Sequence, residues 1–328
     1  MRVVLVGQPN CGKSALFNSV AGYKAMVGNF PGTTVEYLCS PITLSQKHFT
    51  LVDLPGIYSL SSPESEEVTT RRYLLREQPD VIINVLDASV LSRSLELTLE
   101  LLDLQVPMVV CLNMMDEAGK KGIEIDREHL SQDLGVPVVP TIAVQGQGVS
   151  DLFNAALVAA EQRTKGKVFF FSQDIEKPIA ELQSLVNKKT AAGLGVSTRL
   201  LSLKLLEEDR EFEEQALAIQ PDLTGPLPSL RKRISDRHGR SAEMVIASER
   251  HALAVNLFEH VAKVRARVPK PRREQVDQYV MHPLLGYLIL GFILLSLFSL
   301  VFVLGQGLEG PLLGLFDKGA QYLNAFLK

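Results

Sequence analysis

A glycine-rich stretch with the composition of a phosphate-binding loop lies close to the start of the chain. Residues 7–14 read GQPNCGKS and match the pattern GxxxxGK[ST], with an apolar run directly before them and a helical pattern directly after them. Glycines let backbone N–H groups approach phosphate oxygens, Lys13 can reach the β and γ phosphates, and the Ser14 hydroxyl can bind Mg²⁺. The residues expected to line this part of a nucleotide site are Gly7, Gln8, Pro9, Asn10, Cys11, Gly12, Lys13, Ser14 and Ala15.

A DxxG motif follows the next strand pattern, in the run LVDLPG. Asp53 ends that strand, where its carboxylate can hold Mg²⁺ through water, and Gly56 can direct its backbone N–H to the γ-phosphate. Thr33 or Thr34 is expected to contact Mg²⁺ and the γ-phosphate only in the triphosphate state. Ile57 stands where Ras-like enzymes carry the glutamine that orients the attacking water. We therefore expect slow intrinsic hydrolysis.

Two motifs further along the chain indicate guanine as the base. In NMMD the carboxylate of Asp116 can accept paired hydrogen bonds from N1–H and the 2-amino group of guanine, which adenine does not offer. In TIAVQGQG the Ala143 backbone N–H is expected to face the guanine oxygen. The residues assigned to the base are Asn113, Met114, Asp116, Ile142, Ala143 and Val144. A simple polar turn does not explain why all of these motifs occur in this order.

The elements that must position these motifs alternate between short apolar runs and amphipathic helical patterns. The runs expected as strands are Arg2–Val6, Phe49–Val52, Val81–Leu86, Met108–Leu112 and Val136–Pro140. This alternation predicts an α/β fold of the P-loop GTPase type, a mainly parallel sheet flanked by helices. Ligands bind such sheets at the carboxyl ends of the strands, where all of these motifs fall.

The rest of the chain divides by composition into helical and membrane segments. We expect an α/β domain at 1–165, a small all-α domain at 166–268, and a C-terminal segment at 269–328 with a basic juxtamembrane stretch, a transmembrane helix at about 284–304 and an amphipathic tail. The acidic stretch Glu207 to Glu214 is expected to be a solvated helix face rather than a metal-binding one.

Composition excludes several other classes. A net charge of -3 and a pI of about 6.1 do not indicate a dedicated nucleic-acid binder. The three cysteines lack the spacing of a zinc site or a disulfide framework, and the N-terminal MRVVLVG enters a strand directly, so we expect no cleavable secretory signal.

The motifs and the surrounding runs resemble the N-terminal half of the FeoB family, prokaryotic ferrous-iron transporters with a fused G domain. The stretches that carry the resemblance include GQPNCGKSALFNSVAG, VGNFPGTTVEYL, VDLPGIYSLSSPESEE and DQYVMHPLLG. The resemblance implies that Thr34 is the switch threonine beside Ser14 and Asp53 on Mg²⁺. It also implies that a K⁺ ion at Asn10 stimulates hydrolysis, so that catalysis falls to Lys13, Asn10, Thr34 and Gly56.

The resemblance further implies partners and a location. These are Fe²⁺ as the transported ion, the remaining transporter membrane helices, membrane lipid, and small FeoA-like or FeoC-like accessory proteins, with the G domain in the cytoplasm and the chain in the cytoplasmic membrane. Only one full span precedes the last residue, which leaves a fragment, a separately encoded partner or a short form open. The competing hypotheses are a ribosome- or tRNA-related assembly GTPase and a membrane-anchored signalling GTPase without a transport role.

Overall fold

The structure is a computed structural model that describes residues 1–22, 26–29, 36–44, 46–61, 65–265 and 280–326. It comprises two compact units, 1–267 and 268–328, which are taken separately below. The switch threonine candidates Thr33 and Thr34 lie outside the described residues, as does most of the basic juxtamembrane stretch.

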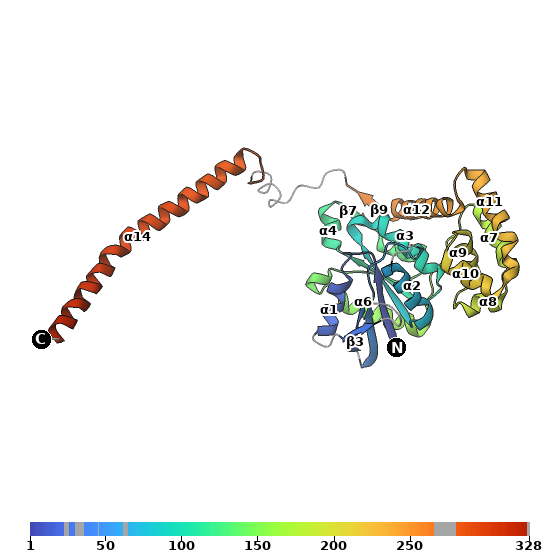
Figure 1. Cartoon of the computed structure of the whole chain (residues 1–328), viewed down its shortest axis with the longest axis horizontal. Helices are drawn as coiled ribbons and strands as arrows, with labels where there is room; N and C mark the ends of the chain where they lie inside the picture. The colour runs from blue at the N-terminus through green and yellow to red at the C-terminus, as the bar shows by residue number, and fades with distance from the viewer. Residues whose placement is uncertain (23–25, 30–35, 45, 62–64, 266–279, 327–328) are drawn as a thin grey trace. The chain divides into compact units, whose positions relative to one another are not determined.

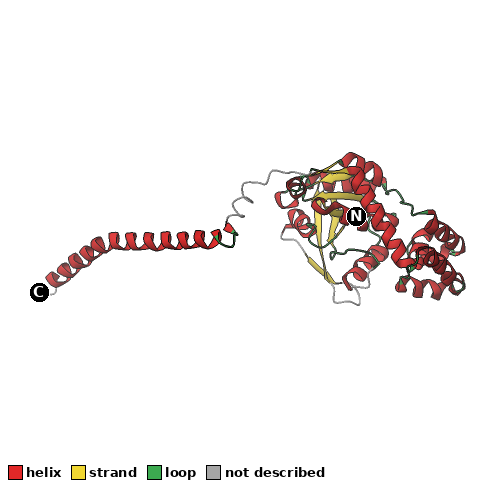
Figure 2. Ribbon diagram, turned by 90° about the horizontal axis from the view of Figure 1, so that it is seen from above, coloured by secondary structure: helices red, strands yellow, loops and turns green. Residues whose placement is uncertain are grey.

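A seven-stranded sheet forms the centre of the first unit (Figures 1 and 2). The strand order is β2-β3-β4-β1-β5-β6-β8, parallel from β4 to β8, with β2 and β3 antiparallel at one edge. The strands are β1 (Arg2–Gly7), β2 (Met26–Asn29), β3 (Glu36–Leu44), β4 (Lys47–Asp53), β5 (Val81–Asp87), β6 (Met108–Asn113) and β8 (Val138–Pro140). Every residue of β6 is buried, as in a strand covered on both faces. The predicted mainly parallel sheet is confirmed.

Helices cover the two faces of this sheet. On one face α1 and α6 pack through Phe17 and Phe153, and on the other α2, α3 and α5 pack through Leu74, Leu95 and Leu130. The helices of this domain are α1 (Lys13–Ala21), α2 (Ser65–Glu77), α3 (Leu91–Asp103), α4 (Met115–Lys120), α5 (Arg127–Leu134) and α6 (Val149–Gln162). Single turns η2 (Ala88–Val90) and η3 (Ala143–Gln145) follow β5 and β8.

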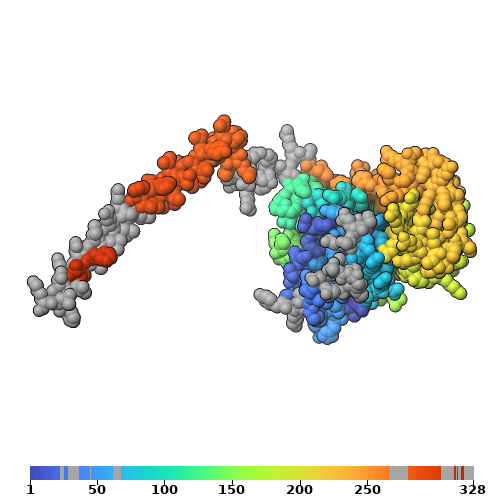
Figure 3. All heavy atoms as spheres, viewed as in Figure 1, coloured from blue at the N-terminus to red at the C-terminus, as the bar shows by residue number. Residues whose placement is uncertain are grey.

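A small all-α domain follows within the same unit, as predicted. Its helices are α7 (Gln173–Leu185), α8 (Lys188–Gly193), α9 (Thr198–Leu206), α10 (Arg210–Ile219), the turn η4 (Pro221–Thr224), α11 (Pro226–His238) and α12 (Ala242–Val261). Several helices begin where the sequence supplies a capping oxygen: Ser197 accepts from the Leu200 N–H and Asp209 from the Phe212 N–H. The space-filling view shows this domain, in yellow, directly against the α/β domain (Figure 3).

Helix α12 belongs to both cores of this unit. Val245 and Ile246 pack in the core of the helical domain, whereas Ala254, Leu257 and Val261 pack in the core of the α/β domain. The chain then forms β9 (Ala262–Val264), which pairs antiparallel with β7 (Ile123–Ile125), just after α4. The two domains are therefore joined by one continuous helix as well as by the chain between α6 and α7.

The second unit contains one long helix, α14 (Leu285–Phe326). Its part Leu285–Val303 has a mean hydropathy of 2.5 and none of it is buried, so by length and composition it is the candidate membrane span in the part of the chain that the structure describes. This agrees with the predicted apolar helix at about 284–304. The helix continues without a break into the predicted amphipathic tail, across the glycines at 305 and 307 that the composition would allow to end it.

Candidate functional site

The sequence motifs meet at one edge of the sheet. β1, β4, β5 and β6 are parallel neighbours, and their carboxyl ends place the loops after Gly7, Asp53, Asp87 and Asn113 side by side. This is the position where α/β sheets bind ligands.

The loop at residues 8–12 has the shape of a phosphate cradle. Lys13 is buried, and its Nζ donates to the backbone oxygens of Gly7 and Gln8, each at 3.0 Å, so the ammonium lies across the loop. Gly12 has a φ of 97°, and a Cβ there would lie 2.2 Å from the amide nitrogen of Asn113. Only glycine fits at this position. Asn10 is exposed with a φ of 63°, and Ala15 is partly buried against the core below.

Ser14 and Asp53 lie together at the start of α1 and the end of β4. The Ser14 hydroxyl donates to Asp53 Oδ2 at 3.2 Å, whereas Asp53 Oδ1 is buried without a hydrogen-bond partner. Burial raises the pKa of Asp53, and the nearby Lys13 ammonium opposes that rise. An orphaned carboxylate oxygen beside a hydroxyl is the donor set that Mg²⁺ prefers, so these residues fit the predicted cation.

The DLPG turn lies directly over the phosphate loop. A Cβ on Gly56 would lie 2.8 Å from the Cα of Pro9 and 3.0 Å from Lys13 Nζ, which leaves no room for a side chain. The Ile57 N–H donates to the Gly7 oxygen at 3.2 Å, and the Ile57 side chain is completely buried in the core. This residue therefore points away from the phosphate position and cannot replace a water-orienting glutamine.

Asn113 joins the phosphate loop to the loop after β8. Its amide nitrogen donates to the Cys11 oxygen at 2.9 Å, and its Oδ1 accepts from the Thr141 hydroxyl and the Ala143 N–H, both at 3.0 Å. The Ala143 N–H, predicted to face the guanine oxygen, is thus directed to Asn113 instead. Sequence reasoning missed Thr141, which is buried and also contacts Cys111.

The base-recognition residues lie around this junction. Met114 has a φ of 59°, a left-handed turn that starts α4, and Asp116 lies in the first turn of that helix with its side chain 29% exposed and 3.9 Å from Lys120. Ile142 forms an isolated bridge with Gln147, and Val144 is largely exposed at the loop tip. Asp116 is thus open to a ligand.

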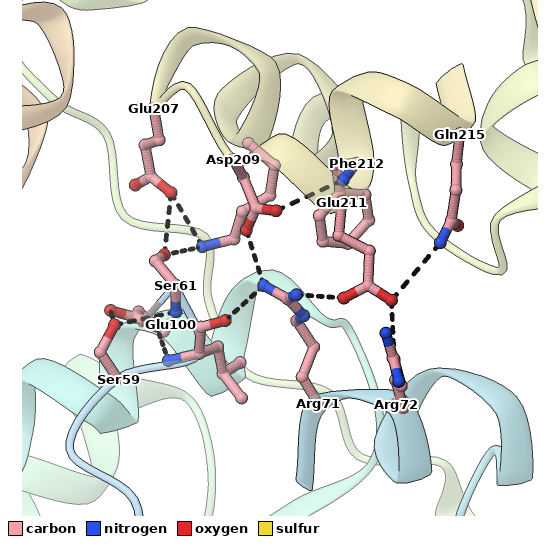
Figure 4. A network of polar contacts seen from close by, with 12 residues as sticks. Ser59, Ser61, Arg71, Arg72, Glu100, Glu207, Asp209, Glu211, Phe212 and Gln215 are labelled. Atoms are coloured by element: carbon pink, nitrogen blue, oxygen red, sulfur yellow. Dashed lines mark hydrogen bonds and ion pairs between the residues drawn. The ribbon is translucent and has the colours of Figure 1, made fainter. Parts of the chain in front are cut away.

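The acidic stretch Glu207 to Glu214 is only in part the solvated face that the sequence indicated, since Glu208 and Glu214 are exposed. Glu207 and Asp209 are buried, and they pair with Lys204 and Arg71 respectively (Figure 4). These two carboxylates were misread because most acidic runs on helices are solvated. Arg71 lies far from Asp209 in the sequence, whereas Lys204 precedes Glu207 by only three residues.

A phosphate loop, a DxxG turn and a guanine-specificity motif on a largely parallel sheet define a P-loop GTPase domain. An all-α domain and an apolar helix follow this domain in the chain. Residues 1–156 match the family model for ferrous iron transport protein B, and residues 171–263 match the model for the FeoB cytosolic helical domain. The chain belongs to the FeoB family.

Individual relatives agree with this assignment. The chain is 33% identical over 315 residues to an Fe(2+) transport protein A/Fe(2+) transporter FeoB fusion protein of Porphyromonas gingivalis, covering 93% of this chain and 37% of that protein. It is 32% identical over 324 residues to the Fe(2+) transporter FeoB of Escherichia coli K12, and the match covers 98% of this chain and 40% of that protein. The chain therefore spans about 40% of the length of the curated relatives it matches.

Solved structures of the cytosolic part are similar over most of the chain. A GDP-bound mutant of S. thermophilus NFeoB superposes with a TM-score of 0.74 and 29% identity over 80% of this chain and 100% of that one. The cytosolic domain of the T. maritima FeoB iron transporter in its GMPPNP form has a TM-score of 0.71 and 31% identity. The match covers 80% of this chain and 99% of that one.

Proposed function

We propose that this chain is the GTP-binding and GTP-hydrolysing regulatory part of a ferrous iron transporter. The arrangement that carries the proposal is the meeting of Lys13, Asp53 and Asn113 at the carboxyl edge of the sheet. Lys13 holds the β and γ phosphates, the backbone of residues 8–15 surrounds them, and Asp116 selects guanine. Similarity to FeoB domains solved with GDP and GMPPNP supports the same ligand.

The nucleotide preference has a direct test. Calorimetric titration of the chain with GDP, GTP and ADP should show binding of the first two only. Lys13→Ala should abolish triphosphate binding, while Lys188→Ala, an exposed lysine of the helical domain, should leave it unchanged. Tighter binding of ADP than of GDP would contradict the proposal.

Mg²⁺ is assigned to Ser14 and Asp53, with Thr34 as the third protein ligand in the triphosphate state. Bound Mg²⁺ supplies positive charge that offsets the charge developing on the phosphates. The chain's own contribution is positional: Lys13 and the Gly56 N–H face the γ-phosphate, and the buried Ile57 provides no group for the attacking water. Slow intrinsic hydrolysis follows from this.

We assign a K⁺ site to Asn10, because its exposed amide is available beside the cradle. A fixed cation there would stabilise transition-state charge, an effect worth about tenfold or more in rate. Hydrolysis should be faster in K⁺ than in Na⁺, and Asn10→Ala should remove the difference. Asn18→Ala, an exposed asparagine of α1, is the matched control. Equal rates of the parent in the two salts would exclude this site.

The transport role needs membrane helices besides α14, since the curated Fe(2+) transporter relatives are much longer than this chain. We assign the chain to the cytoplasmic membrane, with α14 in lipid and the G domain in the cytoplasm, joined to further membrane helices that carry Fe²⁺. A FeoA-like partner is supported by the fused relative, and a FeoC-like one follows from the family resemblance. Iron uptake by an iron-starved, transport-deficient host should require both this chain and downstream helices, and Lys13→Ala should lower it.

A further inference from the structure

The segment after the DLPG turn is held by side chains that do not belong to the nucleotide site. On one side the carboxylate of Glu100, from α3, accepts from the Leu60 N–H at 2.6 Å and from the Ser59 hydroxyl at 2.8 Å. On the other side the Ser61 hydroxyl donates to Glu207 at 3.2 Å and accepts from Lys204 at 2.5 Å. These contacts fix three consecutive residues, with Glu100 on the α/β domain and the other partners on the helical domain (Figure 4).

Arg250 of α12 closes this arrangement into a ring. Its guanidinium lies 3.4 Å from Glu100 and is hydrogen-bonded to Glu207, so one side chain contacts both carboxylates that hold Ser59–Ser61. The side chains of Arg250, Glu100 and Glu207 are 7%, 5% and 4% exposed. Burial disfavours the Glu207 anion, but Arg250 and Lys204 overcome this and lower its pKa to about 2. Glu207 is therefore ionised at neutral pH and pairs with the Arg250 guanidinium.

Arg250 lies on α12 between the part of the helix that packs in the helical domain and the part that packs in the α/β domain. Ala254, four residues after Arg250, lies in the core of the α/β domain, and Ile246, four residues before it, lies in the core of the helical domain. The same helix ends in β9, which is paired to β7 beside α4, and the chain then continues toward α14. A displacement of α12 along its axis therefore moves Arg250 against Glu100.

The turn that faces the γ-phosphate is close to the held segment. Gly56 touches Pro9, and Ile57 is hydrogen-bonded to Gly7, only two residues before Ser59. We propose that Arg250 is a positioning residue for GTP hydrolysis: through Glu100 and Glu207 it makes the placement of Ser59–Ser61, and with it the Gly56 turn, depend on the position of α12. This proposal rests on the proposed GTPase function. It means that GTP hydrolysis is regulated through α12, the helix that precedes the membrane segment in the chain.

The test must separate positioning from simple stability. Arg250→Met alone leaves buried carboxylates without their cation and can unfold the chain. The informative variant is Arg250→Met combined with Glu207→Gln, which removes opposite charges together. The matched control is Arg231→Met with Glu213→Gln, an ion pair of the same chemistry inside the helical domain that does not touch Ser59–Ser61.

The measurements are the thermal midpoint by circular dichroism, and kcat and KM for GTP, on the full chain in lipid nanodiscs. We expect the ring variant to stay folded with a lowered thermal midpoint, because Lys204 loses its carboxylate and Glu100 its cation. Its kcat should fall about tenfold or more, because a small displacement of a reacting group is costly. KM should stay unchanged, since the phosphate loop and Asp116 are untouched. Arg250→Lys should recover part of kcat, because it keeps the charge but loses the fork that spans two carboxylates.

The outcomes separate the two claims. A folded ring variant with the parent's kcat overturns the positioning role and leaves the GTPase function in place. An equal loss of kcat in the control also overturns it, since the effect would then belong to the helical domain in general. A parent chain that does not hydrolyse GTP overturns the proposed function, and this role with it.

Discussion

Asn113 is the residue whose role the structure changes most. The motif NMMD indicates guanine recognition, but the side-chain amide of Asn113 is buried and hydrogen-bonded within the protein. Its nitrogen donates to the Cys11 oxygen, and its oxygen accepts from Thr141 and Ala143. It therefore fixes the distance between the phosphate loop and the base loop. We therefore assign selection of the base to Asp116, because its carboxylate remains partly exposed in the first turn of α4.

This division predicts a change of base preference for Asp116→Asn. An asparagine offers one acceptor and a donor, so it cannot accept from both guanine nitrogens, but it can donate to the additional oxygen of xanthine. GDP affinity should fall about 100-fold, as expected for lost hydrogen bonds to a charged group, while XDP affinity rises. Fluorescence titration with labelled GDP and XDP measures both. Asp222→Asn, on the helical-domain surface, should change neither, and retained GDP selectivity in Asp116→Asn would refute the assignment.

The chemistry of Cys11, a residue of the phosphate loop, is set by its burial. Its side chain is almost completely buried, and burial raises the pKa of the thiol against the opposing effect of Lys13. A protonated, enclosed thiol is a poor nucleophile. It acts as a small apolar residue under the phosphate loop.

At the scale of elements, the sequence predicted the strands that are continuous apolar runs, and it missed the short strands whose partners lie far away in the chain. The run at Met108–Leu112 is apolar throughout and that at Val81–Leu86 is apolar except for Asn84, so both are recognisable as buried strands. β7 and β9 are three residues each and are separated in the chain by all elements from α5 to α12, so no local pattern identifies them. The β2–β3 edge was missed as well, because β3 contains Pro41 and no regular alternation.

Helix α3 held a signal that was available but not used. Glu96, Glu100 and Asp103 stand at helical spacing among leucines, and such spacing places them on one face. In the structure this face meets α12, where Glu96 contacts His251 at 2.8 Å and Glu100 contacts Arg250. Acidic residues in an otherwise apolar helix predict a basic partner in the fold, although not which one.

Asp103 gives this interface a pH dependence. Burial raises the pKa of its carboxyl to about 6, although Arg250, Arg199 and Lys204 oppose the rise. Because the folded-state pKa lies above the ordinary value, ionised Asp103 destabilises the fold, and stability should increase as pH falls from 7.5 through 6. Glu207 has the opposite effect. Because its pKa is lowered to about 2, ionised Glu207 stabilises the fold above about pH 4.5, and this stabilisation is lost as pH falls toward 2.

Asp103→Asn should therefore raise stability at pH 7.5 by about 2 kcal/mol and flatten its pH dependence between 7.5 and 5. Thermal midpoints by circular dichroism across this range provide the measurement. Asp236→Asn, on the exposed side of α11, is the control and should keep the parent slope. A parent and an Asp103→Asn variant with the same slope would contradict the assignment.

At the scale of the whole molecule, the two units bury their apolar surface in different ways. The first unit encloses its cores, so Leu95 and Ile246 are inaccessible to water. In the second, the leucines and phenylalanines of Leu285–Val303 stay exposed, and none of that window is buried by protein. An apolar surface of this extent is stable only when another apolar phase covers it. A bilayer matches a helix of this length.

The membrane assignment predicts that Leu290→Arg combined with Leu294→Arg will release the chain from membranes. Each arginine near the middle of the span costs about 3 kcal/mol of insertion, so together they offset much of the apolar gain. Alkaline carbonate extraction should move the variant from the membrane pellet to the supernatant, while GDP affinity stays at the parent value because the nucleotide site lies in the other unit. Leu185→Arg, at an exposed leucine of α7, should change neither property. A double variant that stays in the pellet would show that α14 is not what holds this chain to the membrane, and one that leaves the pellet but no longer binds GDP would show that the two units depend on each other for folding.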